Sequence, residues 1–205
     1  MRPFFQKEKR EDVLSEGFSL LEILIVVGII GILSAILTFS LADFDEKISF
    51  SNTVSEIKVY LREAQFRSLG VVPGLGGEFD VGYGIHFNFH EKESFRLFWF
   101  KLEDDEKERL SWISDGNGFI EEIEIRDGNF LEDIRTIDGG NVWSHGQQNW
   151  LVIFERPNPE AYIYSDPPGS GFQPRKDGIK ITVSSPSGKY KEVILVKTSG
   201  EISLE

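Results

Sequence analysis

The sequence predicts an α+β fold in which one long N-terminal helix packs on an antiparallel β-sheet. Two observations support this prediction. Between residues 18 and 70 the apolar side chains show helical spacing and no proline interrupts them. Beyond Gly70, short runs in which apolar and polar residues alternate are separated by turn-forming residues. No linker divides the chain into independent soluble domains. We expect four consecutive segments: a leader at 1–17, a transmembrane helical half at 18–41, an amphipathic helical half at 42–70 and a β-rich globular head at 71–205.

Residues 18–41 form the longest apolar run of the chain, and Glu22 is its single charged residue. As a helix this run would span roughly 36 Å, which is enough to cross a bilayer core of about 30 Å with some tilt. Four basic residues precede it, and such a cluster favours a cytoplasmic N-terminus. They are Arg2, Lys7, Lys9 and Arg10. We therefore expect a single-pass protein of the cytoplasmic membrane that contacts membrane lipid and has its head outside the cytoplasm.

Helical spacing continues after this apolar run. The apolar residues recur in alternating steps of four and three, so they form one stripe, while charged residues occupy the other faces. The stripe consists of Phe50, Val54, Ile57, Leu61 and Ala64. Gly70, with Pro73 and Gly74 after it, ends the pattern. We expect one helix of about fifty residues whose stripe is buried against a sheet.

The head contains eight segments that have the composition and alternation of strands. They are residues 83–89, 95–100, 119–126, 150–155, 161–164, 179–184, 192–197 and 201–204. Short polar segments at 90–93 and 186–189 join neighbouring strands, so we expect a hairpin at each. The short spacing of the segments predicts an antiparallel sheet.

Glu22 is the unusual residue of the apolar run. A carboxylate in lipid needs compensation, either from headgroups that the side chain reaches or from a cation supplied on assembly. The residue alone leaves both interpretations open. Ser40-Leu41-Ala42 also fits a secretory cleavage site, and an uncleaved anchor is a further alternative. The length of the run, its glutamate and the amphipathic helix behind it argue against a secretory signal peptide.

The stretch Gly17-Phe18-Ser19-Leu20-Leu21-Glu22-Ile23-Leu24-Ile25-Val26-Val27 resembles the prepilin signal of type IV pilins and pseudopilins almost position for position. The resemblance implies a pilin-like fold, cleavage by a prepilin peptidase between Gly17 and Phe18, and N-methylation of the new amine of Phe18. It also implies that Glu22 neutralises the amine of a neighbouring subunit. Many members of the family have a proline part-way along this helix, whereas this chain has Gly28 and Gly31 there.

The head carries a looser resemblance. The segments Gly82-Tyr83-Gly84-Ile85-His86-Phe87 and Val152-Ile153-Phe154-Glu155-Arg156-Pro157, followed by a strand-glycine-strand unit at 194–204, are similar in order to the H-type (GspH/FimT-like) minor pseudopilins. This implies a structural subunit of a type IV pilus or a type II secretion-like filament. The implied partners are other subunits, the prepilin peptidase and an inner-membrane assembly platform. A filament-tip adhesin, a DNA-uptake subunit and a membrane-anchored enzyme are the alternatives.

Composition restricts other chemistry. The 205 residues include no cysteine and carry a formal net charge of −12, which excludes thiolate zinc sites and disfavours direct nucleic-acid binding by the whole surface. Arg156, Arg175 and Lys176 could still form a local basic patch.

The remaining polar motifs have simple structural interpretations. The acidic run at 103–106 is interpreted as a solvated loop, with a calcium site as the alternative. The Asp-Gly and Asn-Gly pairs at 115–118, 127–129 and 138–141 are interpreted as turns. We expect no catalytic residue, no metal and no cofactor.

Overall fold

The computed structural model describes residues 18–70, 77, 81–102, 118–143, 149–157, 160–166 and 173–205. The chain divides into two compact units, Met1–Asp43 and Phe44–Glu205. One long apolar N-terminal helix and two antiparallel sheets are present, so the predicted α+β class is confirmed at this level.

The helix, α1 (Leu20–Leu69), has 50 residues and belongs to both units. It ends where the Gly70 N–H donates to the Phe66 carbonyl at 2.8 Å. The predicted apolar stripe is confirmed, because each of its five residues is at most 5% exposed; they are Phe50, Val54, Ile57, Leu61 and Ala64. Burial of each large apolar side chain contributes about 1.5–3 kcal/mol, so this face holds the helix against the head.

Two antiparallel sheets form the head, which corrects the prediction of one sheet. The first has the order β3-β2-β1-β6-β7-β8 and the second the order β11-β10-β9-β4-β5. The strands of the first sheet are β1 (Val81–Asn88), β2 (Ser94–Lys101), β3 (Phe119–Glu124), β6 (Asn149–Phe154), β7 (Ala161–Asp166) and β8 (Gln173–Lys176). Those of the second are β4 (Phe130–Asp138), β5 (Asn141–Trp143), β9 (Gly178–Ser184), β10 (Lys191–Lys197) and β11 (Ile202–Leu204).

Three strands were not predicted: β4, β5 and β8. In β4 a register shift between Leu131 and Asp133 interrupts the alternation of inward and outward residues, so the pattern of a strand is weak there. The strands β5 and β8 have only three and four residues, too few for a recognisable alternation. The two predicted hairpins are confirmed, because β1 pairs with β2 and β9 pairs with β10, both antiparallel.

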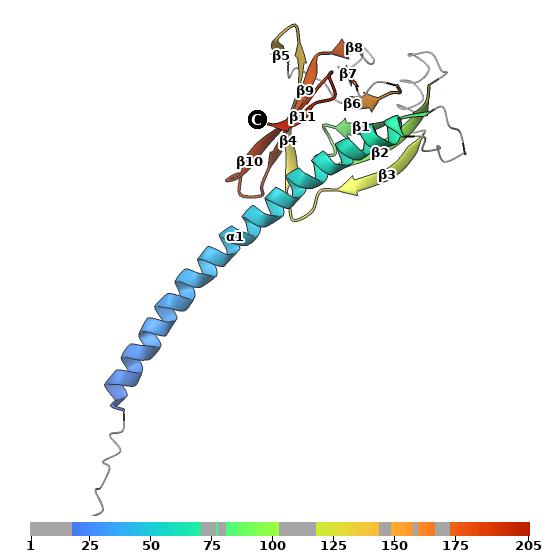
Figure 1. The fold of residues 1–205 in the computed structure, drawn as a ribbon. Helices are drawn as coiled ribbons and strands as arrows, with labels where there is room; N and C mark the ends of the chain where they lie inside the picture. The colour runs from blue at the N-terminus through green and yellow to red at the C-terminus, as the bar shows by residue number, and fades with distance from the viewer. Residues whose placement is uncertain are drawn as a thin grey trace, which may run out of the picture. The chain divides into compact units, whose positions relative to one another are not determined.

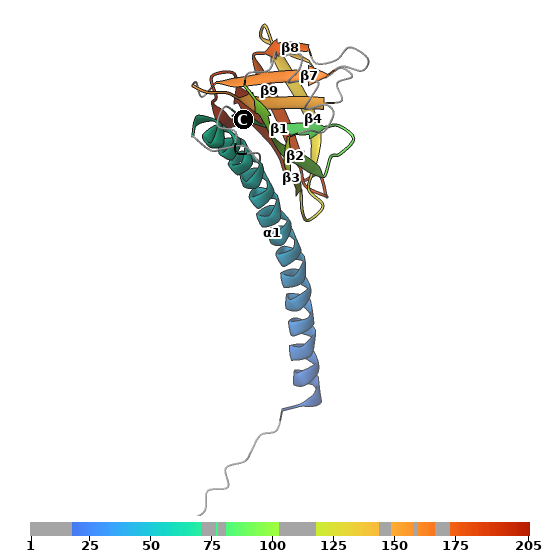
Figure 2. The ribbon, with the colours of Figure 1, turned by 90° about the vertical axis from the view of Figure 1, so that its right-hand side faces the viewer.

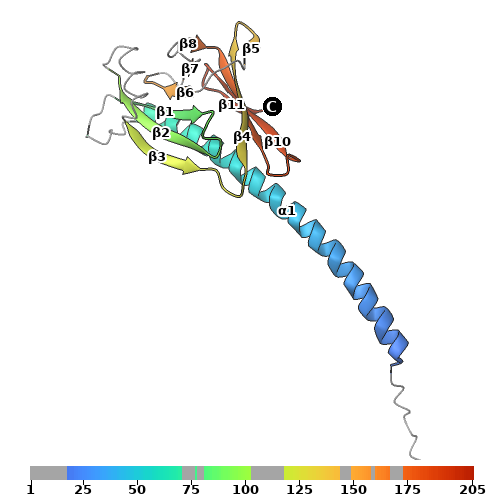
Figure 3. The same cartoon turned by 180° about the vertical axis from the view of Figure 1, so that it is seen from behind.

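The head part of α1 and the inner faces of both sheets share one apolar core. Figures 1 and 3 show this part of the helix lying against β1 and β2. Figure 2 shows β7 running across the view while β4 runs steeply through it, so the strands of the two sheets cross. The shared cluster includes Leu61 of the helix, Ile85 of β1 and Ile181 of β9, all fully buried. The core therefore lies between the helix and the two crossing sheets.

Glycines on β1 make room for aromatic rings on the outer face of the first sheet. Gly82 is the cross-strand partner of Phe100, and Gly84 is the partner of Phe98. A Cβ atom on Gly84 would lie 2.6 Å from the Phe98 ring and 2.7 Å from the Val152 carbonyl oxygen. The rings cover the glycine backbone, and both rings are nearly fully buried in a second apolar cluster. This close approach explains the alternating glycines of the β1 sequence.

A buried hydroxyl connects the end of α1 to the first sheet. Ser68 is fully buried, and its Oγ accepts the N–H of Tyr83 at 2.8 Å and donates to the carbonyl of Phe154 at 2.7 Å. Tyr83 and Phe154 are partners in the ladder between β1 and β6. The serine therefore satisfies one backbone group on each of two neighbouring strands.

A polar contact also joins α1 to the segment that leads from β3 to β4. Asn129 is fully buried, and its Nδ2 donates to Thr53 Oγ1 at 2.9 Å and to Ser49 Oγ at 3.0 Å. Ser49 Oγ in turn donates to the Asp127 carboxylate at 2.7 Å. Because this segment passes from the first sheet to the second, the contact positions the helix against both.

Candidate assembly site

The predicted processing and assembly residues stand at the start of α1. Phe18 is 77% exposed, and Ser19 is the last residue before the helix. Glu22 lies in the first helical turn. Gly17 falls outside the described residues, so the structure says nothing about its side of the predicted cleavage site.

Ser19 is the N-cap of the helix. Its carbonyl accepts the N–H of Glu22 at 3.0 Å and of Ile23 at 3.2 Å, and its Oγ also accepts the Glu22 N–H at 3.2 Å. The cap satisfies backbone donors that have no partner within the helix, which stabilises a helix by about 0.5–2 kcal/mol. Ser19 thus fixes where the helix starts and keeps Glu22 in its first turn.

The position of Glu22 lowers the cost of its charge. A carboxylate in the first turn faces the partial positive charge of the helix N-terminus, an interaction of about 0.3–1 kcal/mol. Among the described residues, no hydrogen-bond donor or cationic side chain pairs with the Glu22 carboxylate. The sequence contains a signal for this placement, because Ser-x-x-Glu before an apolar run is a capping box. The structure forms the Ser19 half of this motif, and the prediction above did not include Ser19 as the N-cap.

Behind this turn the surface of the first unit is apolar and exposed. Large apolar side chains between Leu20 and Leu37 are 49% to 81% exposed. Within the described residues, α1 is the one helix that is long and apolar enough to cross a membrane, and its most apolar stretch has no buried residue. An exposed apolar surface of this extent is typical of a segment that contacts lipid or other protein.

Two of the three predicted turn motifs of the head lie wholly among the described residues. Asp127 and Gly128 have φ of 61° and 72°, and Gly139 and Gly140 have φ of 57° and 79°. These left-handed conformations confirm turns at 127–129 and 138–141. The acidic run at 103–106 and residues 115–117 fall outside the described residues. Across the residues that are described, no group of three His, Asp or Glu side chains could hold a metal ion.

An ion pair lowers the positive charge of the possible basic patch at Arg156, Arg175 and Lys176. Lys176 Nζ lies 2.9 Å from the Asp138 carboxylate, and this lysine is largely buried. Its charge is therefore neutralised by a neighbour within the fold, which weakens the case for a phosphate-binding surface at this position.

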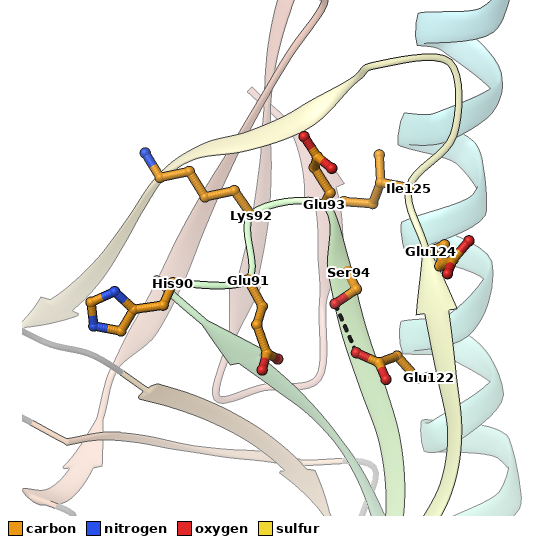
Figure 4. Close-up of a pocket in the computed structure, with 8 residues that line it drawn as sticks. All are labelled: His90, Glu91, Lys92, Glu93, Ser94, Glu122, Glu124 and Ile125. Carbon is orange, nitrogen blue, oxygen red and sulfur yellow. Dashed lines mark hydrogen bonds between the residues drawn. The ribbon is translucent and has the colours of Figure 1, made fainter.

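A hollow of about 600 Å³ lies beside the turn between β1 and β2, and we call it the hairpin hollow. It is lined by His90, Glu91, Lys92, Glu93, Ser94, Glu122, Glu124 and Ile125. Figure 4 shows Glu91 and Glu122 pointing toward the space beside Ser94, while His90 points away from it. Ser94 Oγ donates to Glu122 Oε1 at 3.0 Å. Ser94 is the one hydroxyl among the lining residues, and it is bonded to a carboxylate of the neighbouring strand rather than to an imidazole.

Phe18 and Glu22, the described residues that the sequence predicts for processing and assembly, thus lie at the start of α1. Comparisons with protein families, with characterised proteins and with solved structures find no match to this chain.

Proposed function

We propose that this chain is a structural subunit, a minor pilin or pseudopilin, of a type IV pilus or a type II secretion-like filament. It is cleaved by a prepilin peptidase between Gly17 and Phe18, and it then assembles through its N-terminal helix. The observation that carries the proposal is the first turn of α1. The Glu22 carboxylate lies there at the start of an exposed apolar surface, and it has no partner among the described residues.

The chemistry of the first turn favours a partner that brings a positive charge. Cleavage before Phe18 creates an amine one residue from the helix N-terminus, where the helix dipole disfavours a cation of the same chain. The Glu22 carboxylate of a neighbouring subunit would neutralise that amine, and N-methylation keeps its charge. A buried carboxylate and a buried ammonium are each costly alone and are tolerated as a pair. Pairing between subunits would therefore favour one vertical register.

In this proposal the exposed apolar part of the helix is covered first by lipid and then by other subunits. Before assembly, residues 18–41 would be covered by lipid of the cytoplasmic membrane, with the N-terminus in the cytoplasm and the head outside. On assembly, the helices of other subunits would replace that lipid. The remaining partners in the proposal are the prepilin peptidase and an inner-membrane assembly platform.

The charge pairing is tested with the full chain in a cell that supplies the peptidase and the assembly machinery. Glu22→Gln retains the size of the side chain and removes its charge, so we expect complete cleavage and at least about tenfold less filament in the sheared fraction. Glu56→Gln is the matched control, because Glu56 is a carboxylate on the head part of the same helix and makes no hydrogen bond or ion pair with a described residue. We expect it to assemble normally. Normal assembly of the Glu22→Gln protein would count against pairing.

A further inference from the structure

Polar side chains form a row across the outer face of the first sheet, near the turn between β1 and β2. His86 on β1 is the cross-strand partner of Arg96 on β2, and Arg96 is the partner of Glu122 on β3. On the other side, His86 Nε2 lies 3.0 Å from Asn149 Oδ1 on β6. The row therefore connects four adjacent strands of the sheet.

Arg96 is the permanent cation of this row, and two carboxylates share it. Its Nη2 lies 2.8 Å from Glu91 in the turn and 3.4 Å from Glu122 on β3. Glu91 and Glu122 line the hairpin hollow from opposite sides. Arg96 thus bridges two carboxylates that line that hollow.

His86 stands directly beside this cation. Cross-strand partners place their Cβ atoms about 5 Å apart, so a charged imidazole would face the guanidinium at short range. Among the described residues, the charged groups that act on His86 are Arg96 and Glu91. Glu122 is the cross-strand partner of Arg96 and not of His86. Asn149 contributes a polar oxygen and no charge.

The surroundings favour the neutral imidazole. Burial is the main cause that lowers the pKa of His86 below its ordinary value of 6.5, and the nearby Arg96 acts in the same direction. The contact with Asn149 and the charge of Glu91 oppose this lowering but do not reverse it. In the neutral form with its proton on Nε2, the ring donates to Asn149 Oδ1.

We propose that His86 is an acid-sensitive switch that controls how Arg96 holds Glu91 and Glu122, and thereby the shape of the hairpin hollow. Protonation places a second cation beside Arg96, and the two like charges repel each other across the strand pair. The repulsion is relieved when Arg96 moves away from His86 or when Glu91 turns from Arg96 toward the imidazolium. Both movements weaken the connection between the turn and β3. The proposal stands independently of the filament function.

The direction of the pH dependence follows from linkage. Because the folded pKa is lowered, the unfolded chain binds more protons than the folded chain at pH values between the folded pKa and about 6.5. The contribution of His86 to stability is complete above about pH 6.5 and is lost as the pH falls through the folded pKa.

Thermal unfolding of the full chain in detergent micelles tests the proposal. We expect the Tm of the wild type to fall by a few degrees between about pH 7.5 and about pH 5. His86→Gln retains an N–H donor for Asn149 and cannot be protonated, so its Tm should change distinctly less over this range. His90→Gln is the matched control, because His90 is an exposed histidine in the adjacent turn. It should retain the dependence of the wild type.

A second measurement covers the case in which His86→Gln does not fold. The imidazole resonances of the wild-type protein report the titration of His86 directly, and amide exchange reports the loosening of β2 and β3. We expect a His86 midpoint below 6.5. We also expect the protection factors at Arg96 and Glu122, which correct the observed exchange for the intrinsic rate at each pH, to fall as His86 becomes protonated. A midpoint at or above 6.5, or a pH dependence of Tm that persists in His86→Gln, would overturn the proposal.

Discussion

Ser19 Oγ lies 3.2 Å from the backbone nitrogen of Glu22 and accepts its N–H. This bond places the only charged side chain of the apolar run in the first turn of α1. The same turn is the place where the proposed mature chain would begin, so the cap connects local helix chemistry to the proposed assembly.

The first prediction concerns this cap. Ser19→Ala removes the oxygen that accepts the Glu22 N–H, and the loss of an N-cap costs about 1 kcal/mol. Amide exchange in micelles should therefore be about fivefold faster at Glu22. Ser19→Thr restores a hydroxyl and should exchange nearly as slowly as the wild type. Equal exchange in the alanine and threonine variants would show that the cap does not hold this turn.

The second prediction concerns the glycines of β1. Gly84→Ala places a methyl group against the Val152 carbonyl, which is part of the backbone and cannot move aside. A Cβ atom on Gly82 would lie 2.2 Å from the tip of the Phe100 ring, and a side-chain ring can shift where a backbone carbonyl cannot. Both substitutions should destabilise the head, by about 1–3 kcal/mol in the range typical of overpacking, with the larger effect at Gly84.

Urea unfolding followed by tryptophan fluorescence measures this difference. Gly28→Ala is the control, because a Cβ atom there has no neighbouring atom within 4 Å. It should leave the unfolding of the head unchanged. The packing explanation would be wrong if Gly84→Ala were as stable as Gly28→Ala.

The third prediction concerns the buried hydroxyl of Ser68. Ser68→Ala leaves the Tyr83 N–H and the Phe154 carbonyl without their shared partner, and each unsatisfied buried group costs about 1–3 kcal/mol. We expect a loss of about 2–4 kcal/mol in the free energy of unfolding. Ser55→Ala is the matched control on the same helix, because Ser55 is exposed and donates only to Ser51 in the preceding turn. It should change stability by less than about 0.5 kcal/mol.

The helix could be predicted because its apolar residues follow a strong local pattern. The spacing from Phe50 to Ala64 has one simple explanation, and the run that begins at Phe18 is too long and apolar for an ordinary loop. The positions of the predicted assembly residues could be read from the sequence for the same reason, since Phe18 and Glu22 lie only four residues apart. The cap that Ser19 provides for the Glu22 N–H could also have been read from the spacing Ser19-x-x-Glu22.

The division into two sheets could not be derived in this way. It depends on the crossing near Asn129, whose contacts with Ser49 and Thr53 join residues far apart in sequence. The shift after Leu131 hides the alternation of β4, and the hydroxyl bridge of Ser68 has no local sequence signal. The row that joins His86 to Arg96 likewise appears only once the strand register is known.

The central claim is that the chain is processed like a prepilin, and the N-terminus of the mature protein tests it most directly. Mass spectrometry of the full-length gene product, isolated from membranes that contain a prepilin peptidase, should show a chain that starts at Phe18 and carries one additional methyl group. A chain that starts at Asp43, as a secretory signal would produce, or one that retains the leader would contradict the account.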